Sequence, residues 1–358
     1  MFSPRTTARP FRARTLAPLL AGAGLTLSLA LSGCASAPAD SGDGFRVVAT
    51  TTQLADFVAE IGGDRVELTA LMEPGSSAHH FDPTPAELLE IGRADVLVVN
   101  GAGLEGFIDD AIEASGFDGA LVDASDGLDL DALAHAGGED DGHEHGGEEA
   151  GHEHAEEDVH DEHAGHDHGP VNPHLWTAPK NAAGMVAEVA EGLAAADPEG
   201  AETFRAHAAA YEEQLTALDA WIAENFAAVP EQTRQFVSGH NSLAYYLHDY
   251  GITFVGSLLP SFEDNAEPSA AEMDRLIAQI TEQGVSAIFV ESSMSPKLAE
   301  AIGRDAGVTV VTEGAIYADS LGAAGSGADT YITATIENTR LILGAWGATP
   351  TPLPKELS

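Results

Sequence analysis

Histidines are the residues of this chain best suited to chemistry, and they fall into two groups. The 358 residues hold 15 histidines but only one cysteine, Cys34. Nine histidines lie within residues 135–168, and the other six are His79, His80, His174, His207, His240 and His248. Imidazole nitrogen is a borderline ligand that suits Zn²⁺, Cu²⁺ and Ni²⁺. The sequence therefore predicts metal binding, and a single cysteine rules out a Cys-based zinc finger, an intramolecular disulfide or a redox dyad.

Residues 135–168 are a low-complexity stretch. They include 13 Asp or Glu, no Lys or Arg, and almost nothing apolar, so they cannot bury a core and are predicted to be a disordered loop. So many imidazoles and carboxylates predict weak binding of several metal ions at once. The histidines expected to form this low-affinity metal loop include His143, His145, His152, His154, His160, His163, His166 and His168. The alternative is a solvated spacer whose histidines bind nothing.

The remaining histidines are sorted by their neighbours. His79 and His80 lie in the turn-rich segment 74–85, which follows a predicted strand and precedes a helix. His240 directly follows the predicted strand QFVSG, and His174 precedes a helix start. Ligands of open α/β folds bind at the carboxyl ends of the strands, so these histidines are candidate ligands. The two histidines that fall on helical stretches, and are expected on the surface, are His207 and His248.

A carboxylate completes a candidate metal site. Asp319 follows the last predicted strand, so it could meet histidines from three other loops at one point between two lobes. The predicted ligand set is His79, His174, His240 and Asp319. Three neutral imidazoles and one carboxylate suit four-coordinate Zn²⁺, although Asp319 could instead be a helix cap or turn residue. Glu291 could orient an imidazole or be merely structural, and Trp176 is expected to close the pocket by packing.

Short β-rich runs alternate with amphipathic helical stretches from residue 45 onward. The runs are 46–51, 66–72, 95–100, 120–125, 234–239, 253–259, 286–292 and 308–314. Strands and helices that take turns imply parallel sheets. We therefore predict an α/β fold with two lobes, 45–197 and 229–350, each with an about four-stranded parallel sheet flanked by helices.

One long helix is predicted between the lobes. Apolar residues recur every three or four positions across 198–228, and Asp197-Pro198 is a helix start signal. At about 1.5 Å per residue such a helix would span roughly 45 Å, enough to run along both lobes. The alternative is a pair of shorter core helices.

The N-terminus reads as an export signal. Four arginines precede an apolar run that ends in Leu-Ser-Gly-Cys34, which resembles the lipobox of bacterial lipoproteins. We predict a signal peptide over 1–34, lipid attachment at Cys34 and a flexible tether over 35–44. The alternative is a transmembrane anchor with an incidental cysteine. The expected location is the extracytoplasmic face of the bacterial cell membrane.

The charge of the chain restricts its partners. With 58 acidic and 15 basic side chains the formal charge is −43, which argues against nucleic acid and anionic lipid surfaces as ligands. Few basic groups also disfavour a haem or siderophore receptor, whose ligand is anionic. No HExxH pair is present to indicate a zinc hydrolase, so we expect no enzyme.

Four ordered segments give the chain a family resemblance. HHFDPTP, NPHLW, SGHNSLAYYLHDYGI and YADSLG, with a His-rich insertion before NPHLW, resemble segments of the substrate-binding lipoproteins of zinc and manganese ABC importers. The resemblance covers nearly all of 45–346. It implies two α/β lobes joined by a rigid long helix, a metal ion buried between them, small movement on binding, and a membrane permease as partner. We expect a monomer.

The same resemblance implies the ligands. The first position matches His79, with His80 as the fallback because the histidine is doubled, and the second position matches His174. The third is His in zinc importers and usually Glu in manganese importers, and here it is His240. The fourth matches Asp319. The His-rich insertion is also typical of the zinc branch, so Zn²⁺ is the expected cargo. The alternatives are a manganese or mixed divalent-metal importer component and a surface metal buffer or adhesin.

Overall fold

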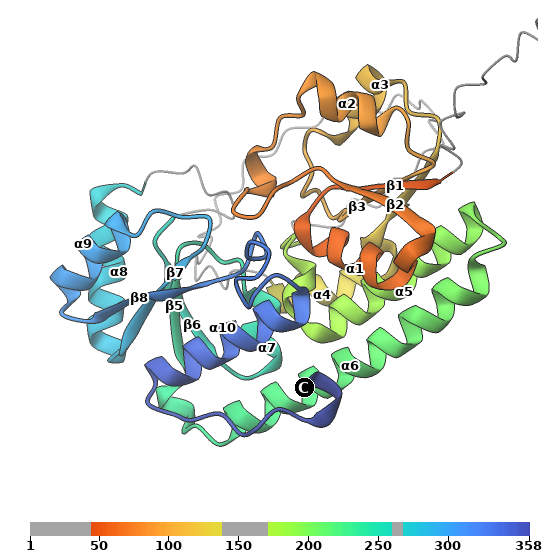
Figure 1. The fold of residues 1–358 in the computed structure, drawn as a ribbon. Helices are drawn as coiled ribbons and strands as arrows, with labels where there is room; N and C mark the ends of the chain where they lie inside the picture. The colour runs from red at the N-terminus through yellow and green to blue at the C-terminus, as the bar shows by residue number, and fades with distance from the viewer. Residues whose placement is uncertain (1–43, 138–170, 260–267) are drawn as a thin grey trace, which may run out of the picture. The chain divides into compact units, whose positions relative to one another are not determined.

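The computed structural model describes residues 44–137, 171–259 and 268–358, which form two α/β lobes (Figure 1). The predicted signal peptide, Cys34 and nearly all of the tether lie outside the described residues, as do residues 138–168 of the histidine-rich stretch. Within the described ranges, no helix combines the length and apolar character needed to cross a membrane.

The first lobe contains a four-stranded parallel sheet with the strand order β2-β1-β3-β4. Its strands are β1 (Phe45–Ala49), β2 (Val66–Ala70), β3 (Val96–Val99) and β4 (Ala120–Asp123). All of β3 is buried, because helices cover both faces of the sheet. These helices are α1 (Thr52–Gly62) and α5 (Pro179–Ala196) on one face and α2 (Pro85–Ile91) and α3 (Ile108–Ser115) on the other (Figure 1).

The second lobe has the four predicted parallel strands, joined by hydrogen bonds as two pairs. β5 (Gln235–Ser238) pairs with β6 (Thr253–Ser257), and β7 (Ala287–Glu291) pairs with β8 (Thr309–Ile316). β5 and β7 lie side by side, and the rings of Phe236 and Phe289 stack between them at 4.7 Å. The helices of this lobe are α7 (Ala244–Asp249), α8 (Ala270–Gln283), α9 (Lys297–Ala306) and α10 (Tyr331–Ala345).

A single helix of 27 residues, α6 (Ala201–Ala227), lies within the range predicted for the long helix. The alternative of two shorter helices is therefore wrong. α6 contacts α1 of the first lobe and α10 of the second. It also packs along α5, which the sequence analysis marked only as a helix start.

One short helix corrects the predicted start of the histidine-rich loop. α4 (Leu130–Gly137) includes residues 135–137, the first three residues of the predicted loop. Leu130 and Leu133, which precede the predicted loop, pack against the main hydrophobic core and so anchor the helix that enters it.

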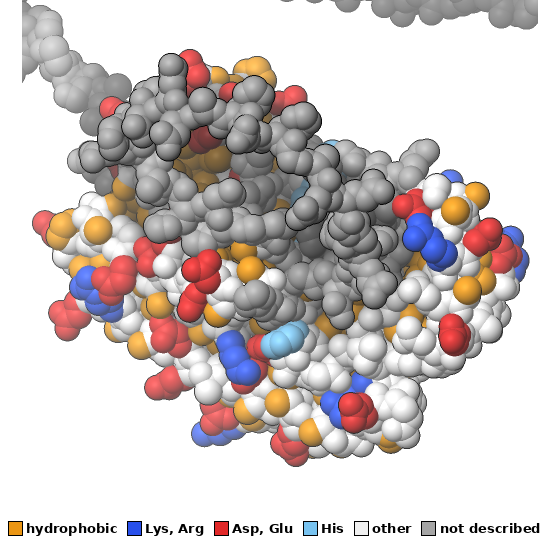
Figure 2. All heavy atoms as spheres, turned by 180° about the vertical axis from the view of Figure 1, so that it is seen from behind, with side chains coloured by type: hydrophobic (Ala, Val, Ile, Leu, Met, Phe, Trp, Pro, Cys, Tyr) orange, Lys and Arg blue, Asp and Glu red, His pale blue; other side chains and the backbone are white. Residues whose placement is uncertain are grey.

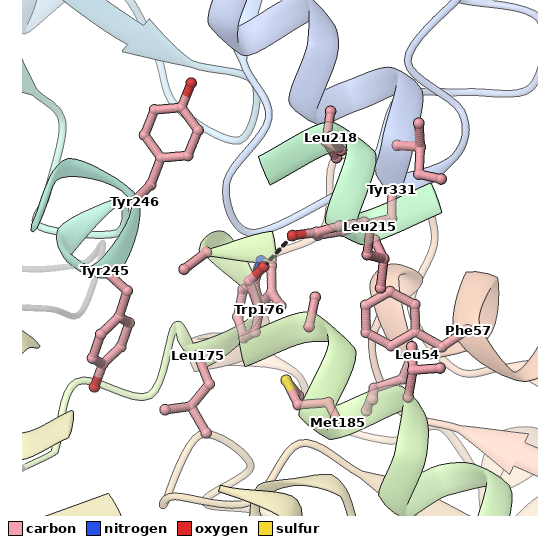
Figure 3. Packing of buried hydrophobic residues seen from close by; sticks show 14 of the residues in the cluster. Leu54, Phe57, Leu175, Trp176, Met185, Leu215, Leu218, Tyr245, Tyr246 and Tyr331 are labelled. Atoms are coloured by element: carbon pink, nitrogen blue, oxygen red, sulfur yellow. Dashed lines mark hydrogen bonds between the residues drawn. The ribbon is translucent and has the colours of Figure 1, made fainter. Parts of the chain in front are cut away.

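The main hydrophobic core is continuous across both lobes. Figure 3 shows side chains from α1, α5, α6 and α10 near Trp176, with Tyr245 and Tyr246 of α7 to one side, and all belong to one buried cluster. The Tyr331 hydroxyl of α10 donates a hydrogen bond of 2.6 Å to the Trp176 carbonyl (Figure 3). Close-packed interiors transmit strain and resist deformation, so the loops on this core are held on one stiff frame.

Candidate metal centre

His79 belongs to the loop that follows β2. The loop ends in a short 3₁₀ turn, Ala78–His80, which begins where the Ser77 hydroxyl accepts a hydrogen bond from the His79 amide at 3.3 Å. His79 is half-buried and its neighbour His80 is exposed. In the described part of the chain, His79 and not His80 lies among the other candidate ligands, so His79 stays the predicted ligand of the two.

His174 is fully buried just before α5 and is oriented by Asn172. The Asn172 side-chain oxygen lies 2.7 Å from His174 Nδ1 and accepts from the His174 amide at 3.1 Å. The Asn172 amide group donates to the Asn241 carbonyl at 2.7 Å, which fixes which end of the side chain is oxygen. Nδ1 of His174 must therefore be the donor, and Nε2 carries the lone pair toward the cluster.

His240 follows β5 and is held by Glu291, the last residue of β7. Glu291 Oε2 lies 2.9 Å from His240 Nδ1, and Oε1 accepts from the His240 amide at 3.1 Å. Side chains crowd the preceding residue, Gly239. A Cβ on Gly239 would lie 2.1 Å from the Met294 sulfur and 2.9 Å from Glu291 Oε1. The sequence-based suggestion that Glu291 orients an imidazole therefore has a geometric basis.

Asp319 lies in the loop after β8 and is 3% exposed. Its Oδ1 is 3.2 Å from His174 Nε2 and 3.3 Å from His240 Nε2. Among the described residues Oδ1 makes no well-directed hydrogen bond, which is unusual for a buried carboxylate oxygen. Ser293 Oγ donates to the other oxygen at the long distance of 3.4 Å. Oδ1 is therefore available to a cation.

The four predicted ligands meet at one point between the lobes. We call His79, His174, His240 and Asp319 the four-residue cluster, since one donor atom of each lies within 4.8 Å of all the others. Nε2 of His174 is 3.1 Å from Nε2 of His79 and 3.2 Å from Nε2 of His240. A tetrahedral ion with bonds of about 2.0–2.1 Å needs donors about 3.3 Å apart, so one small cation fits among them.

The charges of the cluster also favour a cation. Burial disfavours protonation of His240, but the carboxylates of Glu291 and Asp319 outweigh it and hold the pKa of His240 well above its usual value. Burial likewise raises the pKa of Asp319, yet the charge of His240 and the close approach of the His174 and His240 rings outweigh it, so that pKa lies well below its usual range. The metal-free site therefore holds an ionised carboxylate and a proton that a cation can replace.

Other predicted residues lie away from the four donor atoms. The Trp176 ring lies 5.4 Å from that of His174, and its Nε1 donates to the Ala318 carbonyl at 2.9 Å, so Trp176 packs beside the cluster as predicted. The two histidines expected on the surface, His207 and His248, are exposed. Sequence reasoning missed Asn172, although this residue lies in the segment NPHLW, because its bond to His174 depends on how the turn folds.

Comparisons with known proteins place the chain among metal-binding transport proteins. Residues 47–345 match the family described as zinc-uptake complex component A, periplasmic. The manganese-binding lipoprotein MntA of Halalkalibacterium halodurans is 27% identical over 311 residues, which cover 86% of this chain and 91% of that protein. The zinc-binding lipoprotein AdcA of Streptococcus pneumoniae is 28% identical over 262 residues, which cover 73% of this chain and 48% of that protein. A solved structure, the periplasmic zinc-binding protein TroA of Treponema pallidum, is similar with a TM-score of 0.70 at 26% identity, covering 85% of this chain and 99% of TroA.

Proposed function

Because the chain belongs to the periplasmic zinc-uptake complex component A family, we propose that it captures Zn²⁺ and delivers it to an ABC-type permease. The resemblance inferred from the four sequence segments is confirmed, and so is the two-lobe α/β fold. The chain is an extracytoplasmic divalent-metal-binding component of a transporter and not an enzyme.

The observation that carries the proposal is the four-residue cluster. Its donors come from four separate loops of both lobes, and three of its members are fully or almost fully buried. A closed site without an open coordination position suits capture and release better than catalysis. The cluster therefore supports a transport site in which both lobes contribute ligands.

The donor set supports zinc as the cargo. Three imidazoles and one carboxylate are a borderline-soft set that favours Zn²⁺ over the harder Mn²⁺, which prefers more oxygen ligands. The names of the relatives do not choose the metal, since they include manganese and zinc. The second candidate is therefore a manganese or mixed divalent-metal component of the same transporter class.

Three further features belong to the proposal. Cys34 would carry the lipid that anchors the chain to the outer face of the membrane. The histidines of residues 143–168 would add weak auxiliary sites. The monomer would suffice for binding, because one chain supplies all four donors of the cluster.

The test is a titration of the full chain with Zn²⁺ and with Mn²⁺ against a competing chromophoric chelator. We expect one tight Zn²⁺ site that His240→Ala and Asp319→Ala each weaken by about a hundredfold or more, since each removes a direct ligand. His248→Ala is the matched control, because His248 is exposed and outside the cluster.

Two results would contradict the proposal. Equal affinity for Mn²⁺ would favour the mixed-metal alternative. Affinity unchanged by both cluster substitutions would mean that binding resides in the histidine-rich stretch, and the chain would then be a surface metal buffer.

A further inference from the structure

The loop that carries Asp319 belongs to the second lobe but is bonded to the first. Gln53 Nε2 donates to the Ala318 carbonyl at 2.8 Å, and the Leu321 amide donates to Thr52 Oγ1 at 2.9 Å. Thr52 and Gln53 open α1, and all of these side chains are buried or nearly so. The two hydrogen bonds therefore hold the backbone of Ala318 and Leu321, on either side of Asp319.

These hydrogen bonds form a connected network, because Thr52 and Gln53 also bond to each other. Thr52 Oγ1 donates to Gln53 Oε1 at 3.0 Å, so the Gln53 amide must present its NH₂ end to Ala318. The Gly75 amide, in the loop that leads to His79, donates to Ser320 Oγ at 2.7 Å. Networks in which every member is satisfied specify a single arrangement of the buried groups.

The second lobe holds the same loop mainly at its base. Asn338 of α10 accepts from the Tyr317 amide at 2.8 Å and donates to the Tyr317 carbonyl at 2.8 Å. Beyond Tyr317, the described second-lobe side chains close to the Asp319 carboxylate are Ser293, whose hydroxyl donates at 3.4 Å, and His240, whose Nε2 lies 3.3 Å from Oδ1. The first lobe therefore helps to place the carboxylate, through α1 and through Trp176, whose Nε1 donates to the same Ala318 carbonyl.

We propose that Thr52 and Gln53 are positioning residues for Asp319, through which the first lobe fixes the carboxylate that the second lobe contributes to the metal site. This inference rests on the proposed function. It adds that residues of the first lobe position a metal ligand of the second lobe. A metal ligand must be held within about 0.5 Å of the position from which it coordinates the ion. A loop that is hydrogen-bonded on both sides of the ligand can be held this closely.

Capping of α1 does not account for these two residues. Thr51 is the N-cap of the helix and its hydroxyl already accepts from the Leu54 amide at 3.2 Å. Gln53 instead turns its amide toward a carbonyl 265 positions away in the sequence. A buried glutamine that only filled space would leave its polar atoms unpaired, at a cost.

The experiment is a Zn²⁺ competition titration on the full chain with Thr52→Val, Thr52→Ser and Gln53→Leu. Thr52→Val keeps the shape without the hydroxyl, and we expect it and Gln53→Leu each to weaken Zn²⁺ binding about five- to tenfold, the worth of one hydrogen bond. Thr52→Ser keeps the hydroxyl and should bind as the parent does. Tyr246→Phe is the control, because it removes a buried bond of 2.7 Å to Thr339 away from the cluster.

A double-mutant cycle separates positioning from general structure. If Thr52 and Gln53 act through Asp319, their substitution should weaken binding no further once Asp319→Ala is present. Full affinity in both Thr52→Val and Gln53→Leu, or an equal loss with and without Asp319, would overturn the proposal. Thr52→Val and Gln53→Leu test the proposal separately, so if one variant fails to fold, the other still tests it. Absence of tight Zn²⁺ binding by the parent chain would instead refute the proposed function.

Discussion

Each buried imidazole of the cluster has a side-chain oxygen close to its Nδ1, and its Nε2 faces the other donors. For His174 the partner is the neutral Asn172 amide, and for His240 it is the Glu291 carboxylate. A carboxylate behind an imidazole fixes its tautomer and makes it a stronger ligand. His240 should therefore be the more basic donor, and Glu291 should matter for affinity although it is not among the four donors.

Glu291→Gln tests this role. Glutamine preserves the size and an acceptor oxygen but removes the charge behind His240, so we expect Zn²⁺ affinity to fall by about 10- to 100-fold. Competition titration measures the loss, with Glu113→Gln on the exposed face of α3 as the matched control. An unchanged affinity would show that Glu291 only fills space beside the histidine.

Affinity should also depend on pH through His240. Its pKa is raised, so the metal-free protein carries a proton there at neutral pH, and Zn²⁺ must displace it. Below that pKa, affinity should fall about tenfold per pH unit for each proton displaced. The lowered pKa of Asp319 keeps its carboxylate ionised across the same range, so it adds no dependence there. Calorimetry in buffers of different ionisation enthalpy counts the protons released, and a count of zero at neutral pH would refute the assignment.

At the scale of elements, one carboxylate joins three helices. Asp56 of α1 accepts from the Tyr331 amide, at the start of α10, at 2.9 Å and from the Tyr211 hydroxyl of α6 at 3.1 Å. Burial raises the pKa of Asp56 to about 6, although both hydrogen bonds lower it. The folded state thus binds this proton more tightly than the unfolded chain does.

Asp56→Asn should remove the resulting pH dependence of stability. A raised folded-state pKa means that stability is fully present below about pH 4 and declines as pH rises toward 6. Over this pH range the free energy of unfolding falls by at most about 3 kcal/mol, because solvent near this partly exposed residue screens the charge. Urea unfolding of parent and variant with chelator present, at pH 4.5 and 7, gives the difference. A variant that is no more stable than the parent at pH 7 would contradict this account.

The sequence predicted elements better than it predicted contacts between them. All eight strands form near the predicted runs because alternation of strand and helix is a local signal. The pairing of β5 with β6 and of β7 with β8 depends on packing between distant segments, which no local pattern records. The choice of His79 over His80 and the bonds of Asn172, Thr52 and Gln53 likewise arise only when the loops fold against one another.

At the scale of the whole molecule, the shared core makes the frame of the cluster rigid, and the negative charge attracts cations. The core that spans both lobes leaves the cluster on a stiff frame, consistent with small movement on binding. On the described part of the face in Figure 2, acidic and basic side chains are interspersed, and the basic ones do not form a single patch. A formal charge of −43 raises the local concentration of cations around the molecule and so favours capture of a divalent ion.

Deleting residues 138–168 should separate capture at the cluster from gathering by the histidine-rich stretch. All four cluster donors lie outside this range, and His174 is oriented by Asn172 and packs with Trp176, so the tight site should keep its affinity. The number of Zn²⁺ ions bound should fall to one, because eight histidines are lost. Equilibrium dialysis with metal analysis measures both quantities, and a variant of full length with those eight histidines changed to Asn controls for the shortened chain. If the deletion abolished the tight site while the Asn variant kept it, the length of the segment would be what His174 requires; if both lost it, the stretch itself would be the principal binding site.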